Sequence, residues 1–287
     1  MGRTTRVLRW IFPLILTSII WGWGYDVHKR INNKAAHILE GQLGLYTKSH
    51  ADELALYAPV ADFIKNVHHD EFHRHFIDAD LYTTFPFADL NISYEELDIR
   101  FGEDNIKKWG MAPWSIDETA NVLIKMMKTG RWDEALYYMG HLGHYVADLH
   151  MPLHTCANYN GQLTGNDGVH FRWESRMVDE LIPKFEPVGQ VRKIDNFIES
   201  ALIITKDSFS VYPRLLRADS IARKHLNSEQ VKQLNTYNKL HYEDRYLKLL
   251  YAETEDVVHD RLGQAAVLVA SYWYSCWLAA GAPDPPK

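Results

Sequence analysis

The stretch that decides the fold of this 287-residue chain spans residues 139–174 and reads MGHLGHYVADLHMPLHTCANYNGQLTGNDGVHFRWE. Within it His144 and Asp148 stand four residues apart, and His170 and Glu174 repeat that spacing after a loop rich in Gly and Asn. Residues at i and i+4 share one face of a helix, so each pair can direct an imidazole and a carboxylate at one point. The stretch therefore predicts two helices that present donors to a divalent transition metal.

One His-x3-Asp pair alone is a weak signal, because a buried histidine more commonly bonds a backbone carbonyl. The second pair, His154 just past Pro152, and His and Asp residues upstream strengthen it. Several carboxylates that converge in a helical core need cations, because buried unpaired charge is costly. The whole set therefore predicts metal binding. His141 shares the face of His144, and we expect it to support a ligand rather than bind metal.

Apolar residues recur at helical spacing through most of the chain, and no segment alternates as a strand would. Ser115, with Glu118 three residues later, resembles a capping box, and Asp133 is expected to cap the next helix. Residues 83–114 carry Pro and Gly breaks and predict short helices in a surface excursion. The predicted longer helices cover residues 28–43, 49–61, 115–128, 133–151, 169–181, 193–208, 228–240 and 243–280. The fold class is therefore all-α: a compact multi-helix bundle around a central site.

Residues 1–22 have the features of an export signal. Three arginines precede a short apolar run at 11–20, which is too short for a comfortable membrane span. Gly22 could precede the cleavage point, which would leave Trp23 as the new N-terminus and 23–287 as a single domain. We expect an exported protein, secreted or periplasmic. Ile20 is a poor residue near a cleavage site, so a retained N-terminal membrane anchor is the alternative.

Loss of residues 1–22 would remove three arginines and no acids, and so change the net charge from −6 to −9. An acidic protein has no general attraction for polyanions, so any phosphate group must meet local positive charge, which a bound metal would supply. Cys156 and Cys276 are the two cysteines. They could pair in an exported protein, but two cysteines do not make a disulfide scaffold.

Four separated motifs carry a resemblance to a known family. They are Trp23-x4-His28, Asp62 followed by His75-Phe-Ile-Asp78, His144-x3-Asp148-x5-His154, and His170-x3-Glu174. In order and approximate spacing the chain resembles the zinc-dependent phospholipase C family of bacteria, which shares its fold with the fungal single-strand-specific zinc nucleases. The resemblance covers most of residues 23–180, and the C-terminal third matches only as helices.

The resemblance implies a central site of three zinc ions. The implied ligands, zinc by zinc, are Asp62, His75, His144 and Asp148; His154, His170 and Glu174; and Trp23 with His28 and a shared Asp148. Trp23 would bind through its α-amino group and carbonyl. A free α-amine is a ligand only after cleavage, which gives a physical reason for a Trp-Gly start behind a signal peptide.

The resemblance further implies a phospholipase C-like phosphodiester hydrolase, in which a zinc-activated water attacks phosphorus in line. Asp62 would be the catalytic residue that orients or deprotonates this water. In the phospholipases a carboxylate and aromatic rings meet the choline headgroup, and the matching residues in this chain are Asp26, Phe63 and Phe72. Glu174, where the nucleases carry Asp, also favours this branch. The expected substrate is a phospholipid or another phosphodiester, with transient membrane contact.

A single-strand-specific nuclease of the same fold is the alternative. The short spacing from Trp23 to His28 and the Gly-Asn-Asp loop at 165–167 are typical of the nuclease branch. Those enzymes stack bases on aromatic rings, and Tyr159 or Tyr82 could serve. A noncatalytic zinc-stabilised binding protein, or a membrane-anchored helical protein, is the alternative of another class. No stable protein partner is implied, and nucleic acid enters only as a substrate.

Overall fold

The computed structural model describes residues 24–234 and 243–286, and every regular element in these two ranges is a helix. The predicted all-α class is therefore confirmed. The predicted signal segment 1–22 and the predicted ligand Trp23 lie outside the described residues. No helix within the two ranges is both long enough and apolar enough to span a membrane.

The helices along the chain are, in order, α1 (Tyr25–Ile38), α2 (Gly41–Ser49), α3 (Ala51–Tyr57), α4 (Val60–Lys65), α5 (His69–Phe72), α6 (Ala79–Tyr82), η1 (Ala88–Leu90), α7 (Tyr94–Phe101), α8 (Glu103–Trp109), α9 (Ala112–Lys128), α10 (Trp132–His150), η2 (Pro152–Thr155), α11 (Val169–Phe171), η3 (Arg172–Met177), α12 (Val178–Leu181), α13 (Phe197–Arg223), α14 (Ser228–Leu234) and α15 (Glu243–Ala279).

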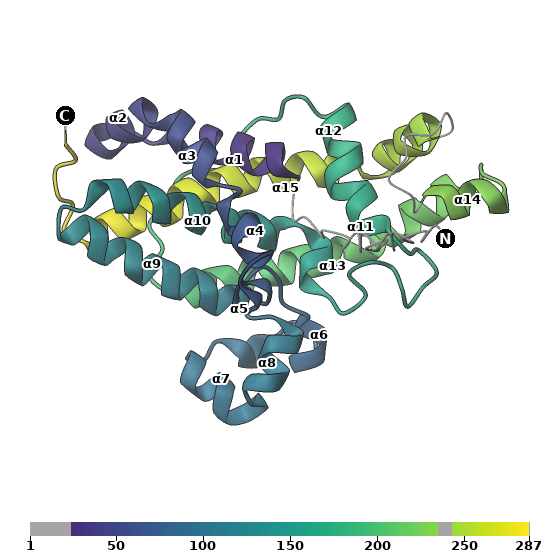
Figure 1. The fold of residues 1–287 in the computed structure, drawn as a ribbon, viewed down its shortest axis with the longest axis horizontal. Helices are drawn as coiled ribbons and strands as arrows, with labels where there is room; N and C mark the ends of the chain where they lie inside the picture. Colours follow the sequence, from purple (N-terminus) through teal and green to yellow (C-terminus); the bar gives the residue numbers. More distant parts are fainter. Residues whose placement is uncertain (1–23, 235–242, 287) are drawn as a thin grey trace, which may run out of the picture.

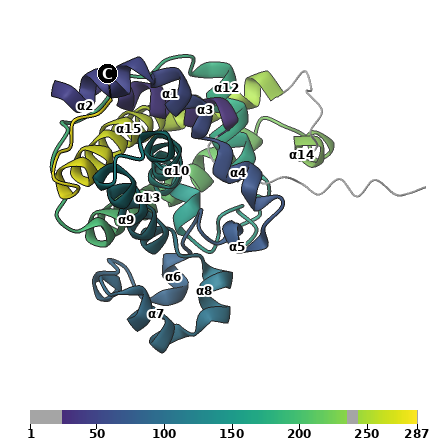
Figure 2. The ribbon, with the colours of Figure 1, turned by 60° about the vertical axis from the view of Figure 1, so that its left-hand side comes forward.

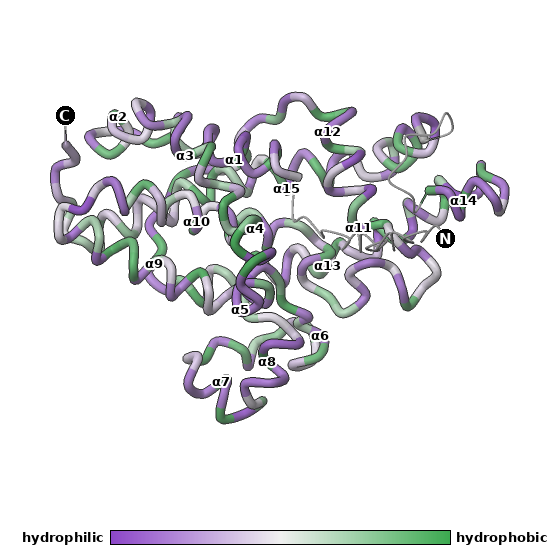
Figure 3. Tube along the Cα trace, viewed as in Figure 1, coloured by the Kyte–Doolittle hydropathy of each residue, from purple (hydrophilic) through white to green (hydrophobic). Residues whose placement is uncertain are grey.

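Helix α10 is the centre of the bundle. It packs against α1, α3, α9, α13 and α15, and Figure 2 shows these helices around it. Every residue of α10 from Met139 to its end at His150 is buried. Along most helices hydrophobic and hydrophilic residues are interspersed (Figure 3), as expected where one face is buried and the other meets water. The polar residues of α10 are therefore placed inside the protein rather than on its surface.

Two glycines of α10 allow neighbouring helices to approach it closely. A Cβ on Gly140 would lie 2.3 Å from the Cβ of Tyr57, and one on Gly143 would lie 2.3 Å from Oδ1 of Asn32. Asn32 fills this contact by donating from Nδ2 to the carbonyls of Gly140 and Leu54, each at 3.2 Å. Because Asn32 stands one turn after His28 on α1, this close approach brings His28 to the level of His144.

Helices α6, α7 and α8 form a small lobe that stands out from the main bundle, as Figures 1 and 2 both show. It covers the stretch predicted to be a surface excursion of short helices, so that prediction is confirmed. The lobe is joined back to the bundle at Gly110, whose φ of +80° suits glycine. A Cβ there would lie 2.2 Å from the carbonyl oxygen of Phe76.

Several predicted helix starts were wrong. Helix α9 begins at Ala112 with a proline in its first turn, so Ser115 lies inside the helix and its hydroxyl donates to the carbonyl of Met111 at 3.2 Å. Arg131, not Asp133, occupies the N-cap of α10. The first predicted helix, 28–43, ends at Ile38 instead, and residues 41–49 form a separate helix, α2. The predicted helix at 49–61 is two helices, α3 and α4, separated at Pro59.

Towards the C-terminus the predicted helices exist, but the bounds of some differ from the prediction. Helix α15 matches the prediction for 243–280 closely, and α13 runs further than the predicted 193–208. Residues 235–240 of another predicted helix lie outside the described residues. Cys156 and Cys276 are both buried and free, so they form no disulfide with one another.

Candidate metal centre

The two i,i+4 pairs lie on helices, as the sequence predicts, but the helix that carries Glu174 is not an ordinary α-helix. His144 and Asp148 lie one turn apart on α10, with Nε2 of His144 3.1 Å from Oδ2 of Asp148. Similarly, Nε2 of His170 lies 3.1 Å from Oε2 of Glu174. Glu174 lies in η3, a π-helical stretch of six residues between α11 and α12. Such π-helical turns are rare and are frequently found at functional sites.

The first donor group consists of Asp62, His75, His144 and Asp148. Nδ1 of His75 lies 2.9 Å from Nε2 of His144 and 3.0 Å from Oδ2 of Asp148. Oδ1 of Asp62 lies 3.8 Å from the same His75 atom and 3.7 Å from that of His144. Zinc bonds of 2.0–2.2 Å in a tetrahedral site separate neighbouring ligand atoms by about 3.3 Å, so these spacings suit one metal ion.

The second donor group consists of His154, His170 and Glu174. Their facing atoms are Nε2, Nε2 and Oε2, with separations of 3.1 Å between the two imidazoles and 3.5 Å from His154 to the carboxylate. His154 reaches this position because α10 ends before Pro152 and the short helix η2 carries His154 back toward the bundle. These residues too could hold a metal.

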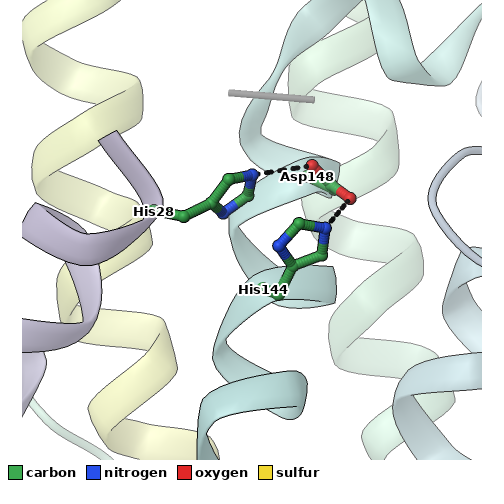
Figure 4. Close-up of side chains that lie close together, drawn as sticks. All are labelled: His28, His144 and Asp148. Carbon is green, nitrogen blue, oxygen red and sulfur yellow. Dashed lines mark ion pairs between the residues drawn. The ribbon is translucent and has the colours of Figure 1, made fainter. Parts of the chain in front are cut away.

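The third donor group consists of His28 and Asp148, which lie close to His144 (Figure 4). Nε2 of His28 is 3.4 Å from Oδ1 of Asp148, and its ring stacks on that of His144 with centroids 3.9 Å apart. Asp148 thus faces the first donor group with Oδ2 and the third with Oδ1. The further ligand expected in this group, Trp23, lies outside the described residues.

His75 lies in an irregular segment that backbone hydrogen bonds fix to two other parts of the chain, η2 and the residues just before α9. The amide of Ile77 donates to the carbonyl of His154 at 2.9 Å, and the amide of Met111 donates to the carbonyl of His73 at 2.7 Å. Asp62, by contrast, lies on the first turn of α4, and Lys65 three residues later contacts its Oδ1. The structure therefore brings together all eight predicted ligands that it describes.

The pKa values of the donor residues reflect the charges of their neighbours in the three donor groups. Burial alone would raise the pKa of Asp148, but His144 and His154 outweigh it and hold this pKa well below its usual value. For Asp62, His144 and Lys65 overcome burial and lower the pKa to about 2. Burial and the neighbouring His144 lower the pKa of His28 to about 4. Both carboxylates are thus ionised, and His28 keeps a free lone pair at neutral pH.

Buried donor atoms without partners show that these residues fit a metal. Oδ2 of Asp62, Oδ1 of Asp148 and both carboxylate oxygens of Glu174 are buried and accept no hydrogen bond from any residue that the structure describes. Both ring nitrogens of His28 are likewise buried and have no hydrogen-bond partner among the described residues. Buried anionic oxygens are costly without donors or cations. A donor set of imidazole and carboxylate suits zinc and other first-row divalent metals.

A cleft opens on the first and second donor groups, because His75, His154 and His170 all form part of its lining. Phe72, Phe76 and Tyr159 also line it. Of the residues predicted to bind substrate, Phe72 is therefore at the cleft. Phe63 does not line it and packs edge-on against Tyr25 at 5.6 Å, and Asp26 is exposed and pairs with Lys29 at 3.8 Å.

Three charged cleft residues were not singled out from the sequence as substrate contacts: Lys65, Lys108 and Asp78. Lys65 follows Asp62 by three residues on one helix, a spacing that could have suggested it. Burial, with the nearby Asp80, raises the pKa of Asp78 to about 7. Its buried Oδ1 meets no hydrogen-bond donor within the described ranges. Lys108 comes from the lobe, and only the fold brings it to the cleft.

The other histidines near the site have mixed outcomes. His68 and His69 are exposed, whereas His73 is buried, because backbone hydrogen bonds hold the segment that carries it against residues 109–112. His141 is buried against the ring of Tyr137, with centroids 4.2 Å apart, and does not belong to any of the three donor groups.

Comparisons with known proteins identify related chains. The profile of the family described as S1/P1 Nuclease matches residues 26–181, more than half of the chain. Among solved structures, Alpha Toxin from Clostridium Absonum matches with a TM-score of 0.48 at 16% sequence identity, covering 91% of this chain and 65% of that one. This chain thus spans about two thirds of the length of the toxin. No curated protein sequence matches.

Proposed function

Because the chain belongs to the S1/P1 nuclease family, we propose that it is an exported, zinc-dependent phosphodiester hydrolase whose substrate is single-stranded nucleic acid. The observation that carries this proposal is the convergence of eight His, Asp and Glu residues on the three donor groups beside one cleft. Phosphodiester hydrolysis is the chemistry that such closely spaced divalent metal sites support best.

The proposed ligands are the members of the three donor groups, with the amino group and carbonyl of Trp23 added to the third. When bound, zinc would supply Lewis acidity, which makes water a better nucleophile near neutral pH and offsets negative charge on the phosphoryl group. The unpartnered buried oxygens of Asp148 and Glu174 support this assignment, because each needs a cation.

Asp62 is proposed to orient the attacking water and to accept its proton. It is nearly completely buried, ionised, and keeps one oxygen without a hydrogen bond among the described residues. Lys65 holds the other oxygen and itself lines the cleft. The side chain of Asp62 is thus fixed on one side and free on the other, as a residue that positions a water must be.

The lining of the cleft favours nucleic acid over a phospholipid with a cationic headgroup. Lys108 places an exposed positive charge at it, and Lys65, which is paired with Asp62, adds a second ammonium group. A positive charge here attracts a phosphate chain and repels a quaternary ammonium. Phe72, Phe76 and Tyr159 offer ring surfaces on which bases can stack. The carboxyl of Asp78, which also lines the cleft, can exchange hydrogen bonds with a base edge.

Phospholipid hydrolysis, the function preferred from the sequence, is the second candidate. One observation favours it: the cleft contains Phe72, an aromatic residue expected to meet a choline headgroup. The other two expected headgroup residues do not line the cleft, and Asp26 is exposed to solvent. We therefore place nucleic acid first.

The test uses the full chain, expressed for export and loaded with zinc. Its activity is measured on single-stranded DNA, on a soluble nitrophenyl phosphodiester and on phosphatidylcholine vesicles, with Asp62→Asn as the inactive control. We expect hydrolysis of the DNA and the soluble diester, and none of the vesicles. Hydrolysis of vesicles alone would reverse the order of the two candidates, and no hydrolysis of any of the three would overturn the proposal.

A further inference from the structure

Glu71 lies on the side of His75 that faces away from the other donors. Nδ1 of His75 points at His144 and Asp148, at 2.9 and 3.0 Å, whereas its Nε2 lies 3.5 Å from Oε1 of Glu71. The two residues are four apart, Glu71 in α5 and His75 just past it. A carboxylate in this place can accept the Nε2 proton and so leave the lone pair on Nδ1 for the metal.

The position of Glu71 is fixed by residues from other helices. The hydroxyl of Tyr145, the residue that follows His144 on α10, donates a short hydrogen bond to Oε1 of Glu71. Nε of Arg74 lies 3.6 Å from Oε2 of Glu71 and donates to the Tyr145 hydroxyl at 3.4 Å. Tyr145 is buried, and only 13% of the Glu71 side chain is exposed. The carboxylate therefore has a built environment rather than a mobile surface position.

A second layer anchors this arrangement to α9. Arg74 donates from Nη1 to Glu118 at 2.6 Å and from Nη2 to Thr119 at 3.2 Å. Glu118 is largely exposed and contacts Nη1 of Arg74, whereas Glu71 lies nearest Nε. The chain thus offers two glutamates that contact the same arginine, only one of which also reaches a donor of the metal centre.

The other histidines of the centre are oriented differently. Nδ1 of His154 bonds the carbonyl of His75 and Nδ1 of His170 bonds the carbonyl of Tyr159, each at 3.1 Å. Nδ1 of His144 and of His28 have no hydrogen-bond partner within the described ranges. Nε2 of His75 makes no hydrogen bond there either, and its 3.5 Å contact with Glu71 is an ion-pair distance. Nδ1 of His154 also lies 3.5 Å from Oδ1 of Asp148, but Asp148 is itself a donor of the centre. Among these five, as far as the structure describes the chain, His75 alone has a carboxylate from outside the donor groups beside its outer ring nitrogen. A carboxylate partner strengthens a histidine ligand more than a neutral carbonyl does.

We propose that Glu71 is a positioning residue of the metal centre, which fixes the tautomer and orientation of His75 and strengthens its bond to the metal, with Tyr145 and Arg74 holding the carboxylate. This inference rests on the proposed function, because it requires the first donor group to bind metal. Glu71 does not line the cleft and is given no contact with substrate.

The test measures zinc affinity of the full, processed chain by competition with a chelator, without substrate, together with the visible absorption spectrum after cobalt substitution. Glu71→Ala is expected to weaken the affinity by about 10–100-fold and to change the cobalt spectrum. Glu71→Gln, whose amide oxygen can still accept the Nε2 proton, is expected to recover a large part of the loss. Tyr145→Phe should give an intermediate loss.

Glu118→Gln is the matched control, because it removes the outer partner of Arg74 and leaves Glu71 against His75. We expect its affinity and its spectrum to equal those of the unaltered protein. If Glu71→Ala binds zinc as tightly as the unaltered protein, or if Glu118→Gln weakens binding equally, the positioning role is overturned.

A second control separates this inference from the proposed function. Asp148→Asn removes a donor of the first group itself. If that variant also keeps its full zinc content and affinity, the metal centre is wrongly assigned. If Asp148→Asn loses zinc while Glu71→Ala does not, only the role of Glu71 fails. Should Glu71→Ala fail to fold, Tyr145→Phe supplies the answer, because it removes a hydrogen bond that holds the Glu71 carboxylate; unchanged zinc affinity and an unchanged cobalt spectrum in this variant would overturn the positioning role.

Discussion

Nε2 of His28 lies 3.4 Å from Oδ1 of Asp148, although the two residues belong to the first helix and to the central helix of the bundle (Figure 4). The other oxygen of Asp148 faces His75 and His144 at 3.0 and 3.1 Å. One buried carboxylate therefore contacts two donor groups at once. Its position depends on Gly143, whose missing side chain lets α1 approach α10.

The first prediction concerns this carboxylate. Asp148→Asn should release about two of three zinc ions and lower the rate of DNA hydrolysis about 100-fold or more, because a neutral amide neither bridges the metals nor balances their charge. Elemental analysis of the purified protein and initial rates measure the two effects. Asp133→Asn, an exposed position on the same helix, is the control and should change neither. Full zinc content and activity in Asp148→Asn would count against the assignment.

Lys108 provides a test of the substrate. It reaches the cleft from α8 of the lobe and is exposed. If it contacts a phosphate of the strand, Lys108→Gln should raise KM for single-stranded DNA several-fold with little change in kcat. The slope of log affinity against log salt concentration should fall by about 0.7, the value for one phosphate contact on a single strand. Lys128→Gln, exposed at the end of α9, should leave both unchanged; an equal effect of the two variants would exclude a specific contact.

The acid sensitivity of the fold can be tested at His150. Burial, with the nearby Arg261, lowers its pKa from 6.5 to about 3, although its bond to the carbonyl of Val146 acts in the other direction. The folded protein therefore excludes a proton that the unfolded chain takes up below the ordinary pKa. The contribution of His150 to stability should be complete above this ordinary pKa and should fall by about 1.4 kcal/mol per pH unit as the pH drops toward the folded value.

The measurement is urea unfolding of metal-free protein near pH 7, 5 and 4, for the unaltered chain and for His150→Asn, whose amide can still donate to Val146. We expect the destabilisation caused by the substitution to shrink steadily as the pH falls. A difference in the free energy of unfolding that does not change with pH would mean that His150 takes up its proton equally in both states.

Asp219 should be essential for the stability of the segment that carries the second donor group. It is completely buried and accepts hydrogen bonds from Arg172 at 2.9 Å and from Tyr246, and Arg223 lies 2.6 Å away. Asp219→Asn would leave two guanidinium groups without their shared anion, and should lower the free energy of unfolding by about 3–5 kcal/mol. Asp207→Asn, exposed on the same helix, should change it by less than about 0.5 kcal/mol. Similar changes in the free energy of unfolding for the two variants would contradict the stabilising role of Asp219.

The local part of the site follows from the sequence, because an i,i+4 spacing on a helix fixes which side chains meet. His144 with Asp148, and His170 with Glu174, are the examples. The positions of Asp62 and His75 follow only from the resemblance to a family, since no local rule brings α4 and the segment after α5 against α10. That Glu174 lies in a π-helix could not be foreseen, because its spacing to His170 suits an ordinary turn equally well.

Helix starts were the least predictable feature, for physical reasons. Ser115 and Asp133 carry the side chains of good caps. However, α9 begins earlier, with Pro113 in its first turn, and α10 begins at Trp132, which is buried against the core. Tertiary burial outweighs a capping hydrogen bond of about 1 kcal/mol. Which residues line the cleft depends on how the lobe packs against the bundle, and no spacing in the sequence encodes that packing. Lys108 is the clearest example.

The most direct measurement is anomalous diffraction at the zinc edge from crystals of the processed, zinc-loaded protein. We predict one peak within the first donor group and one within the second, each with its donor atoms at about 2.0–2.2 Å, and a third between His28 and Trp23. Crystals that contain zinc elsewhere but show no peak in either the first or the second donor group would contradict the metal centre, and the proposed hydrolysis with it.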